Sequence, residues 1–246
     1  MLIGILETGK INESLVPRHG HYPPMFEALL TPADAELRFR AYAVEDGELP
    51  ASPTECDAWL ITGSKHGVYD DLPWIEPLKA FLRAARIAKR PIVGICFGHQ
   101  ILAEALGGKA VKSDKGWGVG VHDYTVTCRP GWMAGAPDTI SVHAFHQDQV
   151  VELPDDATVL ASSPFCEFAM LAYGDPEAPD AISIQPHPEF GEDYTRDLID
   201  LRAGVAIPHD RAGPARDGLG RLVHQQDFAR WCVGFLRAVS AARNAA

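Results

Sequence analysis

The chain has 246 residues, and its 22 Lys and Arg against 33 Asp and Glu give a formal net charge of −11 at pH 7. This acidic balance excludes a basic nucleic-acid-binding protein, and a content of 46% hydrophobic and 22% charged residues is typical of a globular chain with a sizeable core. The longest uncharged apolar stretch, residues 91–103, is shorter than the roughly 20 residues that cross a bilayer, so we expect no membrane span.

Short apolar runs alternate with segments of helical period, which predicts an α/β domain with an open, mostly parallel sheet and helices on both faces. Apolar spacing predicts helices over residues 75–85 and 101–106, the second ending at Gly107-Gly108. Ligands of such sheets bind at the carboxyl ends of the strands, so we expect the site there. The runs that predict strands are Leu2–Leu6, Ala58–Thr62, Pro91–Ile95 and Ala181–Gln185.

The second half of the chain interrupts this pattern. Alternating residues from Trp117 to Val142 predict a small antiparallel insertion. A helix is expected near Asp193–Arg202, and the many Gly, Pro, Asp and Arg residues at 204–220 predict a surface loop. An apolar stripe predicts a closing helix over 224–240 that docks on the sheet. We expect the whole chain, residues 1–246, to form a single domain.

The five cysteines indicate a reducing compartment. They are odd in number and scattered, and the absence of a C-x-x-C pair argues against both a disulfide framework and a thiolate zinc site. Residues 1–7 lack the basic start and the cleavage site of a signal peptide. We therefore expect a cytoplasmic location.

Cys96 lies in the strongest local motif, Gly94-Ile95-Cys96-Phe97-Gly98, where an apolar run ends and a helical pattern begins at once. This is the sequence form of a nucleophile elbow, in which flanking glycines permit a strained turn that exposes the nucleophile. Free amides and the dipole at a helix N-terminus favour a thiolate, so Cys96 is a candidate nucleophile. The alternative is a buried, inert cysteine, which is the commoner role of a lone cysteine.

His187 and Glu189 are the candidate base and its orienting acid. They lie in Gln185-Pro186-His187-Pro188-Glu189, where the prolines favour extended backbone and residues two apart point the same way. The carboxylate can then fix the tautomer of the ring, as the third member of a catalytic triad does. Alone this motif is weak, because a surface histidine near a glutamate is common. It gains weight from following a predicted strand in a chain with an elbow cysteine.

These motifs resemble those of the class I (triad) glutamine amidotransferase family, with Cys96, His187 and Glu189 in the places of its Cys, His and Glu. The resemblance covers most of the chain and implies the α/β fold of that family. It also implies an oxyanion hole formed by two backbone amides, those of Ser64, in the loop after the second predicted strand, and of Phe97, which follows the nucleophile.

The same resemblance implies the surroundings of the substrate. Gln100 is expected to support the substrate pocket, and Phe145 and His146 lie in a segment similar to the one that runs along the bound glutamine in the family. No metal and no organic cofactor are implied. The Gly4–Ile11 segment has the spacing of a phosphate-binding loop, but Ile11 stands where Ser or Thr would hold magnesium, so we expect no nucleotide there.

The chain departs from the family in two ways. Ser64-Lys65 stand where many members have Gly-Pro, which makes that loop less easily strained. The sequence contains no synthetase domain, and the segment after Glu189 is longer than the usual tail. This second departure favours a free-standing member, similar to the glutaminase domains of GMP synthases and to enzymes that hydrolyse γ-glutamyl peptides.

The resemblance implies a small-molecule substrate: the γ-carboxamide of glutamine, hydrolysed through a cysteine thioester to glutamate and ammonia. Two alternatives stay open. One is a γ-glutamyl peptide hydrolase that needs no synthetase, and the other is a catalytically silent regulatory or binding module. A synthetase or a second copy of the chain is the candidate partner, and neither nucleic acid nor a membrane is expected.

Overall fold

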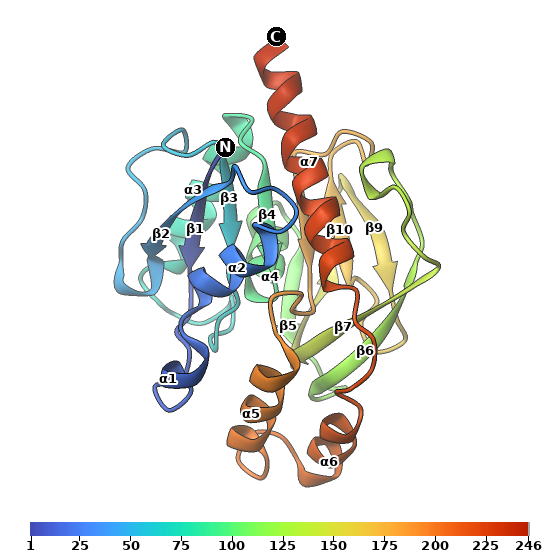
Figure 1. Cartoon of the computed structure of the whole chain (residues 1–246). Helices are drawn as coiled ribbons and strands as arrows, with labels where there is room; N and C mark the ends of the chain where they lie inside the picture. Colours follow the sequence, from blue (N-terminus) through green and yellow to red (C-terminus); the bar gives the residue numbers. More distant parts are fainter. Residues whose placement is uncertain (246) are drawn as a thin grey trace.

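The computed structural model describes residues 1–245, with side chains up to Ala241, and contains a large sheet with helices packed against it (Figure 1). Its strands are β1 (Leu2–Glu7), β2 (Arg38–Ala43), β3 (Ala58–Ile61), β4 (Ile92–Ile95), β5 (Lys109–Lys112), β6 (Gly118–Val126), β7 (Thr139–His146), β8 (Asp148–Glu152), β9 (Ala157–Ser162), β10 (Met170–Tyr173) and β11 (Ala181–Ile184). Its helices are α1 (Val16–His19), α2 (Tyr22–Leu30), α3 (Ile75–Ile87), α4 (Phe97–Ala105), α5 (Glu192–Arg202), α6 (His209–Asp217) and α7 (Gln225–Ala245), with short 3₁₀ helices at Val44–Asp46 and Gly131–Met133.

The large sheet has nine strands in the order β2-β1-β3-β4-β11-β10-β9-β6-β7. Neighbours from β2 to β11 are parallel, and those from β11 to β7 are antiparallel. Strands β5 and β8 form a separate antiparallel pair. Strands β3, β4 and β11 are buried along their whole length, which explains why their sequences are continuous apolar runs.

Hydrophobic cores lie on both faces of the sheet, because neighbouring residues of a strand point to opposite faces. On one face, Leu60 of β3 belongs to a core with Phe26 of α2 and Phe235 of α7. On the other, Trp59 belongs to a core with Leu78 of α3 and apolar residues of α4. The predicted α/β fold, with a mostly parallel sheet covered on both faces, is confirmed.

The four predicted strands are confirmed as β1, β3, β4 and β11, each with bounds that differ by one residue from those predicted. The two helices predicted in the first half are α3 and α4, and α4 ends before Gly107, whose φ is 101°. Strands β6 and β7 form the predicted antiparallel insertion, which β9 and β10 extend within the same sheet.

The interpretation of residues 204–220 as a surface loop is wrong for most of the segment, because α6 occupies its centre. Ala212 and Ala215 of this helix are buried in a small core with residues of β6. Arg211 of this helix donates hydrogen bonds to two backbone carbonyls in the segment before β6, which holds the helix against that segment. Pro214 lies inside this helix, and a proline there is one of the residues that led composition to predict a loop.

The helices expected on either side of this segment are confirmed as α5 and α7. Helix α7 begins one residue later than predicted and extends beyond the predicted end, and Figure 1 shows it crossing one face of the sheet. Within the described part of the chain, no helix combines the length and the apolar character that a bilayer crossing requires.

Candidate active site

Cys96 occupies the turn between β4 and α4, with φ 53° and ψ −101°. L-residues rarely adopt a positive φ, so this turn is strained, as expected of a nucleophile elbow. The two flanking residues must be glycines because a Cβ at either position would clash with backbone atoms. A Cβ on Gly94 would lie 2.5 Å from the carbonyl oxygen of Gly98, and one on Gly98 would lie 2.5 Å from that of Ile61. The tight strand-to-helix turn predicted from the sequence is therefore confirmed.

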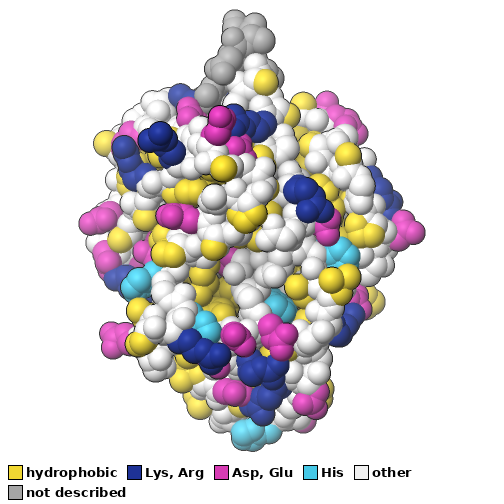
Figure 2. All heavy atoms as spheres, viewed as in Figure 1, with side chains coloured by type: hydrophobic (Ala, Val, Ile, Leu, Met, Phe, Trp, Pro, Cys, Tyr) yellow, Lys and Arg dark blue, Asp and Glu magenta, His cyan; other side chains and the backbone are white. Residues whose placement is uncertain are grey.

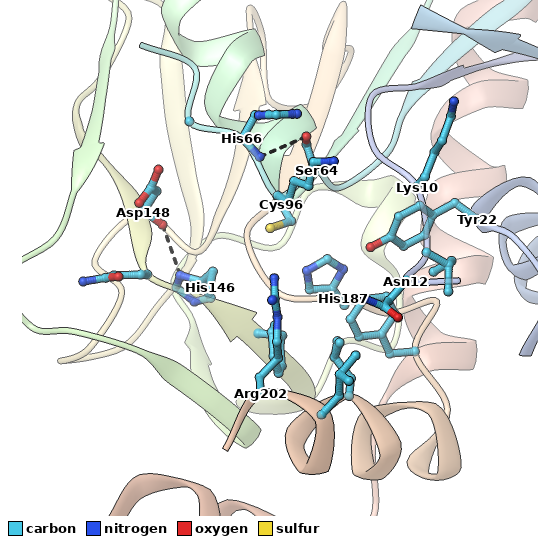
Figure 3. Close-up of a pocket in the computed structure, with 18 of the residues that line it drawn as sticks. Lys10, Asn12, Tyr22, Ser64, His66, Cys96, His146, Asp148, His187 and Arg202 are labelled. Atoms are coloured by element: carbon cyan, nitrogen blue, oxygen red, sulfur yellow. Dashed lines mark hydrogen bonds between the residues drawn. The ribbon is translucent and has the colours of Figure 1, made fainter. Parts of the chain in front are cut away.

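His187 approaches Cys96 from the neighbouring strand. Strand β11 pairs in parallel with β4, so the segments after both strands leave the sheet at the same edge. Both side chains lie beside Gly63 in the loop after β3: a Cβ added there would be 2.9 Å from His187 Cε1 and 3.8 Å from Cys96 Cβ. Figure 3 shows the sulfur of Cys96 and the ring of His187 facing the same cavity.

Glu189 orients the His187 ring. The distance between His187 Nδ1 and Glu189 Oε1 is 2.7 Å, and the two side chains are only 4% and 0% exposed. Because Nδ1 is bonded to the carboxylate, Nε2 is left for the thiol of Cys96. The ring also stacks on Phe190, with ring centroids 3.9 Å apart and an interplanar angle of 9°.

The protonation of His187 follows from its charged neighbours. Burial alone would lower the pKa of His187, but the charges of Cys96 and Glu189 and hydrogen bonds to both raise it above its ordinary value. The ring therefore stays protonated at neutral pH. A protonated imidazole is the partner that stabilises a cysteine thiolate.

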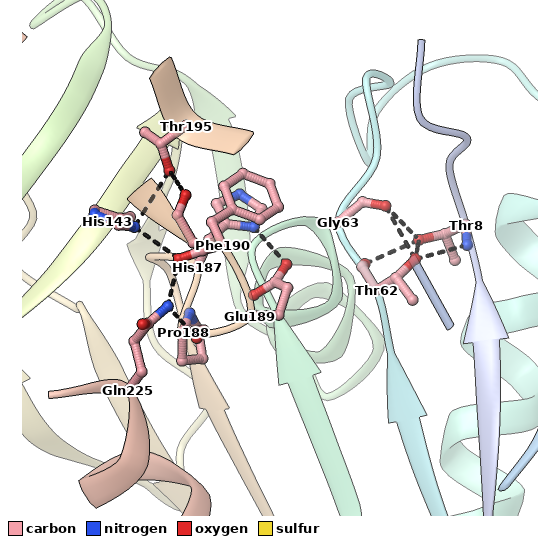
Figure 4. A network of polar contacts seen from close by, with 11 residues as sticks. Thr8, Thr62, Gly63, His143, His187, Pro188, Glu189, Phe190, Thr195 and Gln225 are labelled. Atoms are coloured by element: carbon pink, nitrogen blue, oxygen red, sulfur yellow. Dashed lines mark hydrogen bonds and ion pairs between the residues drawn. The ribbon is translucent and has the colours of Figure 1, made fainter. Parts of the chain in front are cut away.

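Three further side chains hold the segment that carries His187 (Figure 4). The backbone N–H of His187 donates to the carbonyl of His143 over 2.7 Å, and His143 Nδ1 donates to the carbonyl of Phe190 over 2.7 Å. Thr195 Oγ1 lies 3.2 Å from His143 Nδ1, and Gln225 Nε2 donates to two carbonyls of the same segment. Strand β7 and helices α5 and α7 thus fix the position of the imidazole.

The amides of Ser64 and Phe97, predicted to form the oxyanion hole, make no hydrogen bond to residues within 1–245 and are free for an anion. Thr8 Oγ1 donates to the carbonyls of Thr62 over 3.0 Å and Gly63 over 3.4 Å, as Figure 4 shows. The carbonyl and the N–H of a trans peptide point in opposite directions. Thr62 Oγ1 donates to the same Gly63 carbonyl over the shorter distance of 3.0 Å. Both threonines therefore hold this carbonyl, and the Ser64 N–H points away from them.

A cavity of about 720 Å³ opens at Cys96 and His187. The three residues predicted to bind substrate, Gln100, Phe145 and His146, all line it. Figure 2 shows that the face of the molecule seen in Figure 1 is hollowed near its centre, with histidine side chains at the edge of the hollow. The volume lies within the roughly 300–1,000 Å³ of pockets that enclose drug-sized ligands.

Gln100 and His146 are held by the protein itself. Gln100 Nε2 donates to the carbonyl of Asp148 over 3.0 Å and to Gln185 Oε1 over 3.1 Å. His146 Nδ1 donates to the same Asp148 carbonyl over 3.2 Å. Burial lowers the pKa of His146 to about 3, so this ring is neutral. Both side chains therefore shape the cavity wall, and Gln100 keeps its carbonyl oxygen available.

The opposite wall of the cavity was not predicted from the sequence. It includes Lys10 and Tyr22 from the segment after β1, and Tyr194 and Arg202 from α5 (Figure 3). Burial raises the pKa of Tyr22 well above its ordinary value, and the neighbouring Tyr194 adds to this effect. No motif marks these residues, because an arginine at the end of a helix or a tyrosine at its start is ordinary in any helix.

A cysteine at a strained strand-to-helix turn, beside a histidine paired with a carboxylate at the carboxyl edge of a parallel sheet, defines a cysteine-type hydrolytic enzyme. Residues 34–197 match the family model described as glutamine amidotransferase class-I. The chain belongs to this family, as the sequence motifs predicted.

Comparison with curated proteins gives two kinds of relative. Gamma-glutamyl peptidase 5 of Arabidopsis thaliana is 33% identical over 210 residues, which cover 81% of each chain. Gamma-glutamyl peptidase 4 of the same plant is 32% identical over 228 residues, which cover 89% of this chain and 88% of the relative. A glutamine-hydrolysing GMP synthase subunit of Methanopyrus kandleri is 35% identical over 121 residues, or 45% of this chain and 60% of that protein.

Solved structures agree with the fold. A glutamine amidotransferase from Thermotoga maritima superposes with a TM-score of 0.72 at 20% identity, covering 97% of this chain and 98% of that one. A glutamine amidotransferase from Methylobacillus flagellatus gives a TM-score of 0.71 at 20% identity over 94% of both chains.

Proposed function

We propose that this enzyme hydrolyses γ-glutamyl amide bonds whose leaving amine is an amino acid or a peptide, without a synthetase partner. The observation that carries the proposal is the cavity of about 720 Å³ beside Cys96, which is much larger than glutamine and has room for a leaving group. The similarity to two gamma-glutamyl peptidases over more than four fifths of both chains supports it. Of the alternatives left by the sequence, this one fits the cavity best.

In the first half of the reaction, the Cys96 thiolate forms a bond to the γ-carbonyl carbon of the substrate. The negative charge that develops on the carbonyl oxygen is held by the amides of Ser64 and Phe97, and a single donor of this kind contributes about 3 kcal/mol in other enzymes. His187 then transfers its proton to the leaving nitrogen, the C–N bond breaks, and a γ-glutamyl thioester on Cys96 remains.

In the second half, water attacks the thioester carbonyl. His187 accepts a proton from that water, and the C–S bond breaks to release glutamate and restore the thiolate and the imidazolium. Glu189 keeps the ring in one orientation through both halves, because its carboxylate accepts the hydrogen bond from Nδ1.

The test compares purified enzyme on a γ-glutamyl dipeptide and on glutamine, with glutamate release as the readout. We expect turnover of the dipeptide to exceed that of glutamine, and Cys96→Ser to abolish both. Cys128→Ser is the matched control, because Cys128 is a free, half-buried cysteine outside the cavity lining. Mass spectrometry after rapid quenching should find the γ-glutamyl thioester on Cys96.

Two results would contradict the proposal. Turnover of glutamine alone, raised by a synthetase, would give the chain the role of an amidotransferase component, which the 35% identity to a GMP synthase subunit favours as the second candidate. Absence of turnover on both compounds, with no adduct on Cys96 from a glutamine-mimicking electrophile, would make it a silent binding module.

The same proposal includes a single domain and a reducing cytoplasm. The five free cysteines support that location, since disulfides are rare in cytosolic proteins and common in secreted ones. The proposed reaction uses side chains and backbone amides of the enzyme and water, without a metal or an organic cofactor.

A further inference from the structure

Part of the cavity wall comes from chain segments outside the family match at residues 34–197. These segments are residues 10–22, which follow β1, and residues 198–202 at the end of α5. They are joined across the rim, because Arg18 Nη1 and His19 Nε2 each lie 2.7 Å from the carboxylate of Asp197. This wall therefore includes residues that lie outside the segment matched by the family model.

Arg202 and His21 are basic side chains of this wall that make no hydrogen bond or ion pair with the side chains described, and the same holds for Lys112 elsewhere in the cavity lining. Of the three, Arg202 is the one that presents a planar fork of N–H donors. Lys10 pairs with Asp46 at 2.6 Å and, on the other side of the cavity, Lys65 pairs with Glu45 at 3.2 Å. The guanidinium of Arg202 makes no hydrogen bond and no ion pair with any side chain up to Ala241, the last one that the structure describes. In a chain with a net charge of −11, a cation left without a carboxylate is available for a ligand.

The backbone of Arg202 is nonetheless firmly placed. Its carbonyl accepts the N–H groups of Val205, Ala206 and Ile207 at 3.1, 3.0 and 3.0 Å, which ends α5 in a tight turn. The ordinary role of an arginine in a last helical turn is to bond the free carbonyls, and its side chain does not do so here. Figure 3 shows the side chain directed from the end of α5 into the cavity, toward Cys96 and His187.

The direction of the leaving group follows from the proposed reaction. The leaving nitrogen must face His187, which protonates it, and the rest of the leaving group then extends away from the oxyanion-hole amides of Ser64 and Phe97. Arg202 lies on the His187 side of the thiol, on the helix that directly follows the His187 segment. A guanidinium presents a planar pair of N–H donors that matches a carboxylate.

We infer that Arg202 binds the α-carboxylate of the leaving amino acid or peptide and so selects γ-glutamyl compounds that end in a free carboxylate. The inference rests on the proposed function and names the substrate class of the same cavity. Leu198 and Leu201, beside Arg202 on α5, add an apolar surface for the side chain that carries this carboxylate.

The test measures kcat and KM on a γ-glutamyl dipeptide, on the same dipeptide with a C-terminal amide, and on glutamine. Wild-type enzyme should prefer the free acid. Arg202→Gln should raise KM for the acid by about ten- to a hundredfold, the range for losing a charge-assisted hydrogen bond, and leave the amide and glutamine unchanged. Arg202→Lys should restore part of the loss. Arg196→Gln is the matched control, because Arg196 lies on the same helix, pairs with Glu192 at 2.6 Å and does not line the cavity.

Equal losses on the acid and the amide, or a wild-type enzyme indifferent to the carboxylate, would overturn the inference. A failure of the proposed function is distinguishable, because calorimetric binding to Cys96→Ser requires no turnover. The Cys96→Ser protein should bind the free acid more tightly than the amide, and the double variant with Arg202→Gln should bind both equally. That result would support the carboxylate site even if the proposed reaction were wrong. If Cys96→Ser binds neither compound, the site is refuted.

Discussion

Glu189 influences both the orientation and the charge of His187. The carboxylate is wholly buried and lies 2.7 Å from Nδ1, so its charge acts on the ring with little screening by water. Together with Cys96 it raises the pKa of His187 against the opposing effect of burial. We therefore expect this pair of residues to set the alkaline limit of the proposed activity.

Replacing Glu189 with Gln should lower kcat by about a hundredfold or more and move the alkaline limb of the pH profile to lower pH. The alkaline limb moves to lower pH because removing a neighbouring anion lowers the pKa of His187. The protonated ring that donates to the leaving amine is then lost at a lower pH. The profile of kcat/KM measures this, and the pH dependence of Cys96 alkylation gives the same readout if turnover is too slow.

Glu192→Gln provides the comparison for this variant, because Glu192 is a partly exposed carboxylate three residues along the chain that pairs with Arg196. It should leave both limbs of the profile in place. An alkaline limb that Glu189→Gln does not move would show that the carboxylate has no electrostatic role in the reaction.

At the level of residues, sequence reasoning brought together the side chains that occur in short motifs. Cys96 lies between two glycines that steric contacts require, and His187 and Glu189 share an extended segment. Tyr22 and Arg202 could not be found in this way, because each reaches the cavity only through the packing of α2 and α5 against distant segments. The chemical roles of all five remain proposals.

The start of helix α4 depends on the space at Gly98. Replacing Gly98 with Ala would place a methyl group 2.5 Å from the carbonyl oxygen of Ile61, which is backbone and cannot rotate away. We expect a loss of about 1–3 kcal/mol in the free energy of unfolding, and a loss of activity because Cys96 is the N-cap of this helix. Urea unfolding and the kcat of the variant measure the two effects.

Gly213→Ala should raise the free energy of unfolding rather than lower it. Gly213 lies inside α6, and a Cβ added there has no atom within 4 Å. Alanine in a helix interior is favoured over glycine by about 1 kcal/mol, so this variant should be slightly more stable and fully active. A comparable loss in both variants would indicate that the contact at Ile61 is not the cause.

Elements with strong apolar patterns were predicted, and elements that depend on their partners were not. Strand β2 has the sequence RFRAYA and lies at the edge of the sheet, largely exposed, so that it lacks an apolar run. Strand β10, by contrast, is as short and as buried as β3, β4 and β11, but its apolar run MLAY was not recognised as a strand in the sequence. Helix α6 contains Gly213 and Pro214 and forms because alanines and Ile207 pack against β6. Composition alone could not reveal these contacts.

At the level of the whole molecule, the cavity is closed by segments from opposite ends of the sequence. Asp197→Asn should loosen the contact of α5 with Arg18 and His19 and so raise KM severalfold, with kcat retained. The thermal unfolding midpoint should fall only slightly, since Arg18 is exposed, Asp197 is partly exposed, and ion pairs in contact with water add little stability. Steady-state kinetics and calorimetry together test this separation.

Asp227→Asn removes the carboxylate of another exposed pair, with Arg230 on α7, and should change neither quantity. If Asp197→Asn behaves in the same way, the contact between the two segments does not contribute to substrate binding. A fall in kcat without a change in KM would instead indicate that the variant disturbs the His187 segment.

The order in which the neighbouring strands β4 and β11 leave the ribosome has a further consequence. Translation delivers the thiol at residue 96 long before the imidazole at residue 187, although the two strands pair side by side in the finished sheet. A nascent polypeptide therefore exposes a cysteine that has neither its proton donor nor its buried anion. If the proposed roles of these residues are correct, we expect chains that end before β11 to lack the activity, which would arise only when the last parallel strand inserts.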